Sequence, residues 1–167
     1  PQGMGMVDNE SLLPRVLSAI IYLYTDHTGT PVYVGQTIQD LDKRDAQHLG
    51  SNKGKFDSTY KSKDQYSLAI INEKTFDASE YNYGDGDDHT RMVDDCQKWL
   101  DEKEIHYIWL HSTYTEGLNS TRGGQGGSWL RKCMEAIKKK SIEQFRTVYL
   151  PGIKDIVETH KKDVNVP

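Results

Sequence analysis

Residues 20–37 read IIYLYTDHTGTPVYVGQT and give the clearest indication of the fold. Its first six residues and its last six are rich in β-branched and aromatic side chains, which is typical of strands. Between them, DHTGTP carries a glycine and a proline, the residues that most often interrupt regular structure. The stretch therefore predicts a β-hairpin in which Tyr22 and Tyr33 stand on neighbouring strands.

The segments that follow predict a mixture of helices and one more strand. Residues 40–50 predict a helix that Asp40 caps and Gly50 ends. Residues 11–19 fit either a short helix or an extended lead-in. The other predicted elements are a strand at 66–71, helices at about 92–113 and 128–150, a shorter helix at 153–161, and loops at 51–65 and 117–127. The helix at 92–113 is expected to bury an apolar stripe of Val93, Trp99, Leu100, Ile105, Ile108 and Trp109.

Length and composition indicate one globular domain. The chain has 167 residues, of which 35% are hydrophobic and 28% charged, values typical of a polar-surfaced globular protein. It contains neither a long apolar run nor a signal-peptide pattern, so an intracellular protein of the cytoplasm or nucleus, with no membrane contact, is expected. Cys96 and Cys133 form no CxxC pair, which favours free thiols over a zinc site.

Charge is unevenly distributed along the chain. The net charge of −4 argues against a nucleic-acid binder. However, residues 72–104 hold eleven acidic and four basic side chains, whereas residues 128–162 hold nine basic and four acidic ones. An acidic chain can therefore still present one positive face. Residues 72–92 include YGDGDD and are expected to form an exposed acidic insertion.

Several side chains have chemistry suited to a phosphate. Arg44 is a permanent cation, and His48, one helical turn later on the same face, can donate or accept a proton. Glu104 could hold a hard divalent cation such as Mg²⁺. Each has an ordinary alternative, because charged helix faces are usually solvated and strand tyrosines are common. Nothing local to the sequence selects Glu104 over its acidic neighbour Glu102.

Taken together, these residues resemble the GIY-YIG nuclease family. Residues 20–22 (IIY) stand where the family has GIY, with isoleucine replacing the first glycine, and residues 33–35 (YVG) stand where it has YIG. Arg44, His48, Glu104 and Asn119 follow in the order in which the family has its arginine, its histidine or tyrosine, its metal-binding glutamate and its late asparagine. The resemblance implies a small antiparallel or mixed three-stranded sheet flanked by helices, an α/β fold.

The resemblance also implies a mechanism. One Mg²⁺ or Mn²⁺ per site, bound by Glu104, would contact the scissile phosphate of DNA. Tyr22, with its pKa lowered by nearby cations, would serve as general base, and Tyr33 would support it, although the sequence leaves the two open. Arg44 would stabilise the transition state, and His48 could share a proton with Tyr22. Asn119 would brace the site.

Candidate DNA contacts lie outside this group. They are Lys43, Lys53, Lys55, Arg122, Lys138, Lys139 and Lys140, with the glycine-rich loop at 123–127 offering backbone amides to phosphates. A soluble helix face is the alternative for the three consecutive lysines. The tripeptide GGQ at 123–125 also occurs in peptide-chain release factors, but a three-letter match is weak, and a flexible loop is the preferred interpretation.

The sequence thus predicts an N-terminal arm at 1–18, a GIY-YIG-like nuclease domain at 19–127 and a basic helical C-terminal extension at 128–167. The expected activity is a metal-dependent endonuclease of the homing, restriction, repair or mobile-element type, with double-stranded or branched DNA as partner. A homodimer is expected if both strands are cut. The alternative is a catalytically silent member of the fold that binds nucleic acid or protein.

Overall fold

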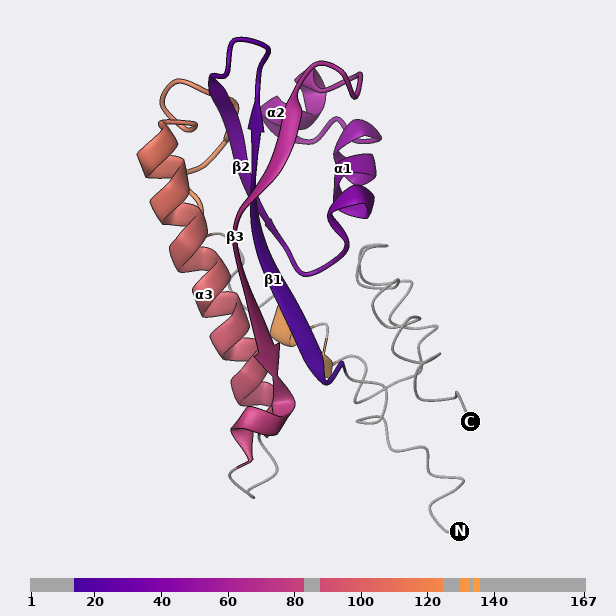
Figure 1. Ribbon diagram of the computed structural model, residues 1–167, viewed down its shortest axis with the longest axis vertical. Helices are drawn as coiled ribbons and strands as arrows, with labels where there is room; N and C mark the ends of the chain where they lie inside the picture. The colour runs from indigo at the N-terminus through magenta and orange to yellow at the C-terminus, as the bar shows by residue number, and fades with distance from the viewer. Residues whose placement is uncertain (1–13, 83–87, 125–129, 133, 136–167) are drawn as a thin grey trace.

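A computed structural model describes residues 14–82, 88–124, 130–132, 134 and 135 of the chain. Its centre is an antiparallel sheet of β1 (Val16–Thr25), β2 (Pro31–Thr37) and β3 (Ser67–Asp77), in the order β2-β1-β3. The elements joined to it are α1 (Leu41–Leu49), α2 (Gly54–Thr59), the short 3-10 helix Ala78–Tyr81 and α3 (Asp88–His111). Figure 1 shows α3 along one face of the sheet and α1 and α2 on the other. The predicted three-stranded α/β fold is confirmed.

The central strand β1 is buried on both faces from Ile21 to Tyr24. Its successive side chains point to opposite faces of the sheet, and helices cover both of those faces. Leu17, Ala19 and Ile21 belong to the core cluster that includes the buried residues of α3. Tyr22 and Tyr24 point to the opposite face, where they form a second, aromatic cluster with residues of α2 and with Tyr60. One strand thus separates an aliphatic core from an aromatic one, and the aromatic side holds the hairpin tyrosine.

The hairpin predicted from residues 20–37 is confirmed. Its turn is closed by the Asp26 carboxylate, whose Oδ1 accepts hydrogen bonds from the backbone amides of Thr28 at 2.9 Å and Thr30 at 3.0 Å. Gly29 has a φ of +84°, in the left-handed region that favours glycine. The register pairs Tyr22 with Gly35. On its other side, β1 pairs with β3, and the register of that pairing shifts between Ile21 and Tyr22.

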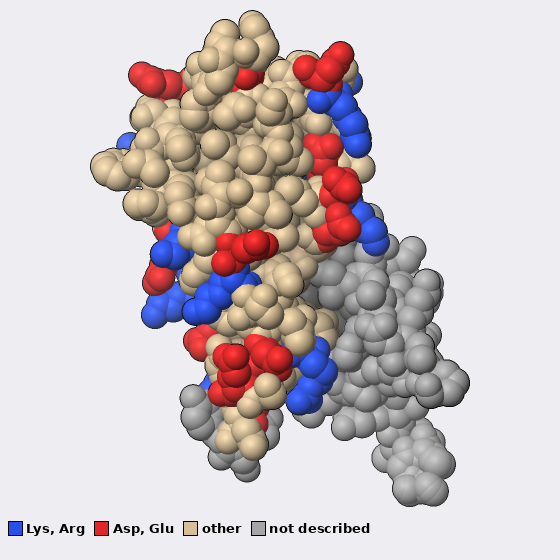
Figure 2. Space-filling model, viewed as in Figure 1, with Lys and Arg blue, Asp and Glu red and all other residues tan. Residues whose placement is uncertain are grey.

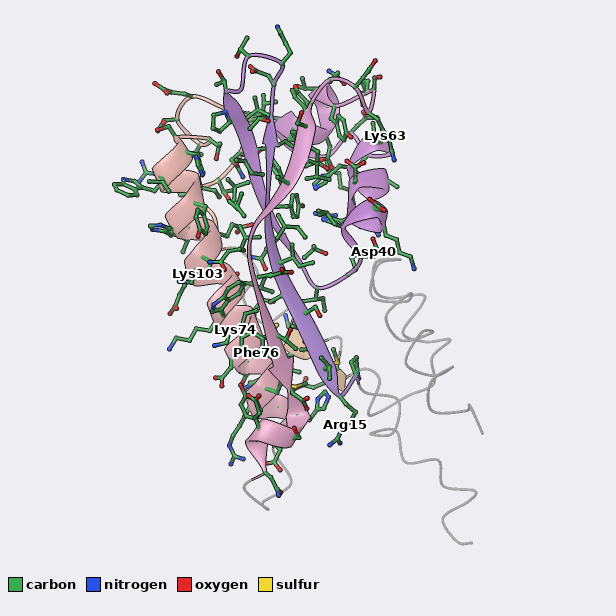
Figure 3. The ribbon with its side chains drawn as sticks, viewed as in Figure 1. Arg15, Asp40, Lys63, Lys74, Phe76 and Lys103 are labelled. Atoms are coloured by element: carbon green, nitrogen blue, oxygen red, sulfur yellow. The ribbon has the colours of Figure 1, made fainter. Side chains whose placement is uncertain are left out.

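Helix α1 begins and ends where the sequence predicted. The Asp40 carboxylate accepts a hydrogen bond from the backbone amide of Asp42 at 2.8 Å, and Gly50 is the C-cap. Figure 3 shows Asp40 at the start of α1 and Lys63 beside its far end, where Lys63 Nζ lies 3.8 Å from Asp45 Oδ2.

Strand β3 is longer than predicted. Its pairing with β1 continues to Asp77, opposite Val16, so residues 72–77 belong to the sheet rather than to an exposed insertion at 72–92. Phe76 is buried, and Lys74 Nζ lies 5.0 Å from the centre of its ring (Figure 3). Pairing with β1 along its whole length outweighs the acidic composition of this segment. Residues 83–87, with most of YGDGDD, lie outside the described residues.

Two other segments differ from prediction. Helix α2 lies within 51–65, which was expected to be a loop, because Phe56 and Tyr60 are apolar anchors that become buried in the aromatic cluster. The lead-in at 11–19 is strand from Val16 onward. Of the predicted helices at 128–150 and 153–161, only residues 130–132, 134 and 135 are described.

Helix α3 buries a narrower stripe than predicted. Val93, Leu100 and Ile108 are buried as expected, but Trp109 is 74% exposed and Ile105 is 46% exposed. Ile108 faces the sheet, so the residue after it is rotated by about 100° toward solvent. Trp99 packs against the core, and Trp129 lies outside the described residues. None of the helices among the described residues is long and apolar enough to cross a membrane.

Replacing Gly35 with alanine is expected to destabilise the protein by about 1–3 kcal/mol through overpacking. A Cβ at this position would lie 2.3 Å from Cζ and from the hydroxyl oxygen of Tyr22, whose ring occupies the space above Gly35. Urea unfolding monitored by circular dichroism measures the change. Gly50→Ala is the control, since the nearest atom to its Cβ is 3.5 Å away. Equal unfolding midpoints for the two variants would contradict the prediction.

Candidate active site

A cavity of about 980 Å³ opens beside the sheet. It is lined by residues from β2, α1, the segment from Gly50 to α2, α3 and the loop at 118–121. The predicted site residues that line it are Tyr33, Arg44, His48, Glu104 and Asn119. The fold thus brings together side chains that are up to 86 positions apart in the sequence.

Tyr22 lies at the cavity without lining it. Its side chain is fully buried, with its ring over Gly35 and its hydroxyl 2.7 Å from His48 Nε2. Arg44 also hydrogen-bonds this hydroxyl. Because Arg44 lines the cavity and contacts the phenol, it connects the buried hydroxyl to the space that a substrate would occupy.

The acidity of Tyr22 differs from the prediction. Burial raises the pKa of Tyr22 to about 12, and the neighbouring Arg44 guanidinium lowers it by a smaller amount. The predicted effect of the cation is therefore present, but desolvation outweighs it. At neutral pH the phenol is protonated, so it could accept a proton only while giving up its own.

Tyr33 contributes a wall of the cavity. Its ring stacks on Phe56, with 4.3 Å between ring centres and 16° between planes. It lies 6.4 Å, centre to centre, from the ring of Tyr22. Burial raises the pKa of Tyr33 well above its ordinary value. The two motif tyrosines are neighbours, as predicted, with Tyr33 nearer the open space.

Helix α1 presents Arg44 and His48 on one face, as predicted. Arg44 Nη1 donates a hydrogen bond to Gln47 Oε1 at 3.2 Å. His48 is 1% exposed, and its Nδ1 lies 2.6 Å from Asp57 Oδ1 on α2. Burial lowers the pKa of His48, Arg44 lowers it further, and Asp57 opposes both effects. The imidazole is therefore neutral at pH 7.

Glu104 stands on α3 at the far wall of the cavity. Its Oε1 accepts a hydrogen bond from the backbone amide of Gly124 at 3.0 Å, and Gln36 also hydrogen-bonds its carboxylate. Burial raises the pKa of Glu104, and these hydrogen bonds oppose the rise. A partly desolvated carboxylate facing a cavity is a favourable position for a cation.

The surroundings of Glu104 suit an ion such as Mg²⁺, which needs few protein ligands, better than an ion held entirely by protein side chains. Among the described residues there is no cluster of three or more His, Cys, Asp and Glu side chains able to hold a metal. Mg²⁺ is commonly held by one or two carboxylates, with waters and substrate phosphates completing its shell. One carboxylate at the wall of a large cavity is compatible with that mode.

Asn119 braces the edge of β2. Its Oδ1 accepts a hydrogen bond from the backbone amide of Val34 at 2.9 Å, and its Nδ2 donates one to the Val34 carbonyl, also at 2.9 Å. The adjacent amide of Leu118 donates to the Val32 carbonyl at 2.7 Å. The segment at 118–119 thereby pairs with the edge of the strand that carries Tyr33.

The Asn119→Ala variant is expected to lose about 2–4 kcal/mol of stability, because it leaves the buried amide and carbonyl of Val34 unpaired. Urea unfolding measures this loss. Asn119→Asp keeps the acceptor but not the donor, and an intermediate loss is expected. If the stability of Asn119→Ala stays within experimental error of the wild type, Asn119 is not a brace.

The predicted DNA contacts are placed unequally. Lys53 and Lys55 line the cavity, and Lys43 is exposed on α1. Arg122 is exposed, with its guanidinium 5.4 Å from the centre of the Tyr114 ring. The loop amides were predicted to contact phosphates. The amide of Gly124 does not fit this prediction, because it donates its hydrogen bond to Glu104. Lys138, Lys139 and Lys140 lie outside the described residues.

The face seen in Figure 2 carries basic and acidic side chains interspersed, with an acidic group over the lower ends of β3 and α3. Among the described residues, the Lys and Arg side chains that line the cavity are Arg44, Lys53 and Lys55.

Sequence reasoning missed three supporting residues. Asp57 is one of two acids in the lysine-rich stretch 51–65, and nothing in the sequence pairs it with His48. Gln36 follows the YVG motif directly, and its Nε2 donates to Asp101 Oδ1 at 2.9 Å. Asp45 accepts hydrogen bonds from the hydroxyls of Tyr24 at 2.5 Å and Tyr60 at 2.7 Å, and it anchors the aromatic cluster. Strand alternation could have placed Gln36 on the α3 side.

Comparison with known proteins identifies the class to which this fold and cavity belong. The family model of the GIY-YIG catalytic domain matches residues 18–119. The chain therefore belongs to the GIY-YIG family, whose catalytic domains are nucleases that act on DNA. Neither the curated proteins nor the solved structures that were compared gave a match.

Proposed function

We propose that this protein is a divalent-metal-dependent endonuclease that hydrolyses phosphodiester bonds in DNA. The observation that carries the proposal is the cavity, in which Arg44, His48 and Glu104 face one space with Tyr22 hydrogen-bonded beneath it. A cation, a proton acceptor and a carboxylate at one cavity are the groups that phosphoryl transfer requires.

Binding of the phosphate is assigned to the cationic wall. Arg44 is half-buried, and its permanent charge would stabilise the negative charge that develops on the phosphate oxygens. Lys53 and Lys55 would neutralise neighbouring phosphates of the strand. The cavity volume of about 980 Å³ leaves room for more than one nucleotide unit of an extended strand.

Glu104 is assigned to one Mg²⁺ or Mn²⁺. When bound, the ion would polarise the scissile phosphate and stabilise the leaving 3′ oxygen. The chain's own contribution is to hold the carboxylate in place through Gly124 and Gln36, leaving the rest of the coordination sphere to water and DNA.

Tyr22 is assigned as the general base. Because the phenol is protonated at neutral pH, it would pass its proton to His48 Nε2, 2.7 Å away, as its oxygen takes a proton from the attacking water. Its hydroxyl is buried, so the water would reach it where Arg44 meets the cavity. Tyr33, on the cavity wall, would position that water.

Incubation of supercoiled plasmid with the purified protein and Mg²⁺ or Mn²⁺ tests the proposal, with EDTA as the control. Metal-dependent nicking or linearisation is expected. The ratio of linear to nicked product reports whether a dimer cuts both strands, since one site of this kind cuts one strand. If the folded protein cuts neither plasmid nor a branched DNA with either metal, the protein is a silent binding member of its family.

A further inference from the structure

Asp57 is an acidic residue at a cavity that is proposed to bind DNA, where its negative charge is unfavourable. It lines the same cavity as Lys55 and the site residues, where an acidic side chain repels the phosphates of DNA. Its side chain is 15% exposed, and its Oδ1 lies 2.6 Å from His48 Nδ1. A carboxylate kept at this position at an electrostatic cost to substrate binding requires a compensating role.

The scaffold fixes Asp57 firmly. Its neighbour Phe56 is 2% exposed and stacks on Tyr33, which locks α2 against the aromatic cluster. At the start of α2, the amide of Lys55 donates to the Ser120 hydroxyl at 3.3 Å. Asp57 is therefore presented to His48 by a helix anchored on two sides.

The donor and acceptor properties of the three groups determine the proton positions. An ionised carboxylate can only accept hydrogen bonds, so the hydrogen between Asp57 and His48 belongs to Nδ1. A neutral imidazole then has a lone pair at Nε2, which accepts the hydrogen bond donated by the Tyr22 hydroxyl. With 1% of His48 exposed, solvent does not compete for either nitrogen.

We propose that Asp57 is a positioning residue that holds His48 as its Nδ1–H tautomer, so that Nε2 is free to take the proton of Tyr22. In the reaction, the proton leaves the Tyr22 oxygen for His48 Nε2, and the phenolate oxygen takes a proton from the attacking water. Asp57 keeps the Nδ1 hydrogen bond and stabilises the imidazolium that results. Asp57 acts only through His48 and touches no reacting atom. This inference rests on the proposed function.

The tautomer can be measured without activity. In protein labelled with ¹⁵N-histidine, the ring of His48 is assigned as the signal missing in His48→Gln. The wild type is expected to show a protonated Nδ1 and an unprotonated Nε2 at pH 7.5. Asp57→Asn presents an amide in the place of the carboxylate, and we expect the ring to shift toward the Nε2–H form, as the amide can donate to Nδ1. A wild-type His48 protonated at Nε2 alone would overturn the proposal.

Kinetics provide the second measurement. Asp57→Asn is expected to lower the single-turnover rate of plasmid cleavage at saturating Mg²⁺ by about 10²-fold or more, the range for loss of a proton-transfer partner. Its affinity for DNA should be equal to or higher than that of the wild type, because a negative charge has been removed from the cavity. Asp42→Asn, the same change at an exposed position of α1, should leave the rate unchanged.

These outcomes separate the two proposals. If the wild type does not cut DNA, the proposed function fails, and the ¹⁵N measurement still decides whether Asp57 sets the tautomer of His48. If the wild type cuts and Asp57→Asn cuts at the same rate, the positioning role is wrong while the nuclease stands.

Discussion

The Glu104→Gln protein is expected to lose metal-dependent cleavage by about 10³-fold or more, a barrier increase of about 4 kcal/mol. Glutamine has the size of glutamate and can still accept the hydrogen bond from the Gly124 amide, but it carries no charge to attract a divalent ion. The rate of plasmid nicking at saturating Mg²⁺ measures the effect. Binding of Mn²⁺, followed by electron paramagnetic resonance, should weaken in parallel.

The stability of the Glu104→Gln protein should not fall with its activity. Burial raises the pKa of Glu104, so the folded protein favours the protonated carboxyl more strongly than the unfolded chain does. Ionisation of Glu104 therefore opposes folding at pH 7, and glutamine, which mimics the protonated form, should leave stability unchanged or increase it. A loss of activity together with a loss of stability would point to misfolding instead of a lost metal ligand.

Glu102→Gln is the matched control for Glu104→Gln. It makes the same chemical change two residues away, at an exposed position of α3 that lines a different hollow from Glu104. This variant should cut DNA at the wild-type rate. If Glu102→Gln is inactive and Glu104→Gln is active, the assignment of the metal ligand is wrong.

Local sequence patterns predicted the hairpin and α1, because the residues that specify these elements lie within them or at their ends. The two hairpin strands around Tyr22 and Tyr33 are rich in β-branched and aromatic residues, and Asp40 and Gly50 cap the two ends of α1. The full length of β3 was not predictable in this way. Its charged second half is strand because β1 offers it a partner along its whole length, which is a tertiary effect.

The candidate site was predictable for a different reason. No single one of Arg44, His48 and Glu104 is distinctive, and only their order relative to the two hairpin tyrosines identified them. Asp57 could not be found, because its role depends on α2, which forms where Phe56 meets the aromatic cluster. The pKa of Tyr22 was predicted in the wrong direction, since the sequence reveals the cation nearby but not how completely the phenol is buried.

The Tyr22→Phe protein is expected to cut DNA about 10²–10⁴-fold more slowly than the wild type. It keeps the ring over Gly35 but has no hydroxyl to pass a proton between water and His48. The lost hydrogen bond leaves His48 Nε2 buried without a partner, so a stability loss of about 1–3 kcal/mol is also expected. Rates must therefore be measured at a temperature where urea unfolding shows the variant to be folded.

The pH dependence of cleavage tests the proton transfer from Tyr22 to His48 more directly. His48 must be neutral to accept the proton, and its pKa is lowered below the ordinary value near 6.5. Wild-type activity should therefore be maintained at pH 7 and should decline only at a lower pH than an ordinary imidazole would give, where Nε2 becomes protonated. The residual activity of Tyr22→Phe should not show this acidic decline, because its proton no longer passes through His48.

Tyr33→Phe decides between the two phenols. Tyr33 lines the cavity and stacks on Phe56, so its ring should keep the wall intact without the hydroxyl. Because Tyr22 has His48 as an acceptor at 2.7 Å, Tyr33→Phe is expected to slow cleavage less than Tyr22→Phe does. A larger loss for Tyr33→Phe, with the acidic decline retained in Tyr22→Phe, would transfer the role of base to Tyr33. Tyr22 and His48 would then be a buried structural pair.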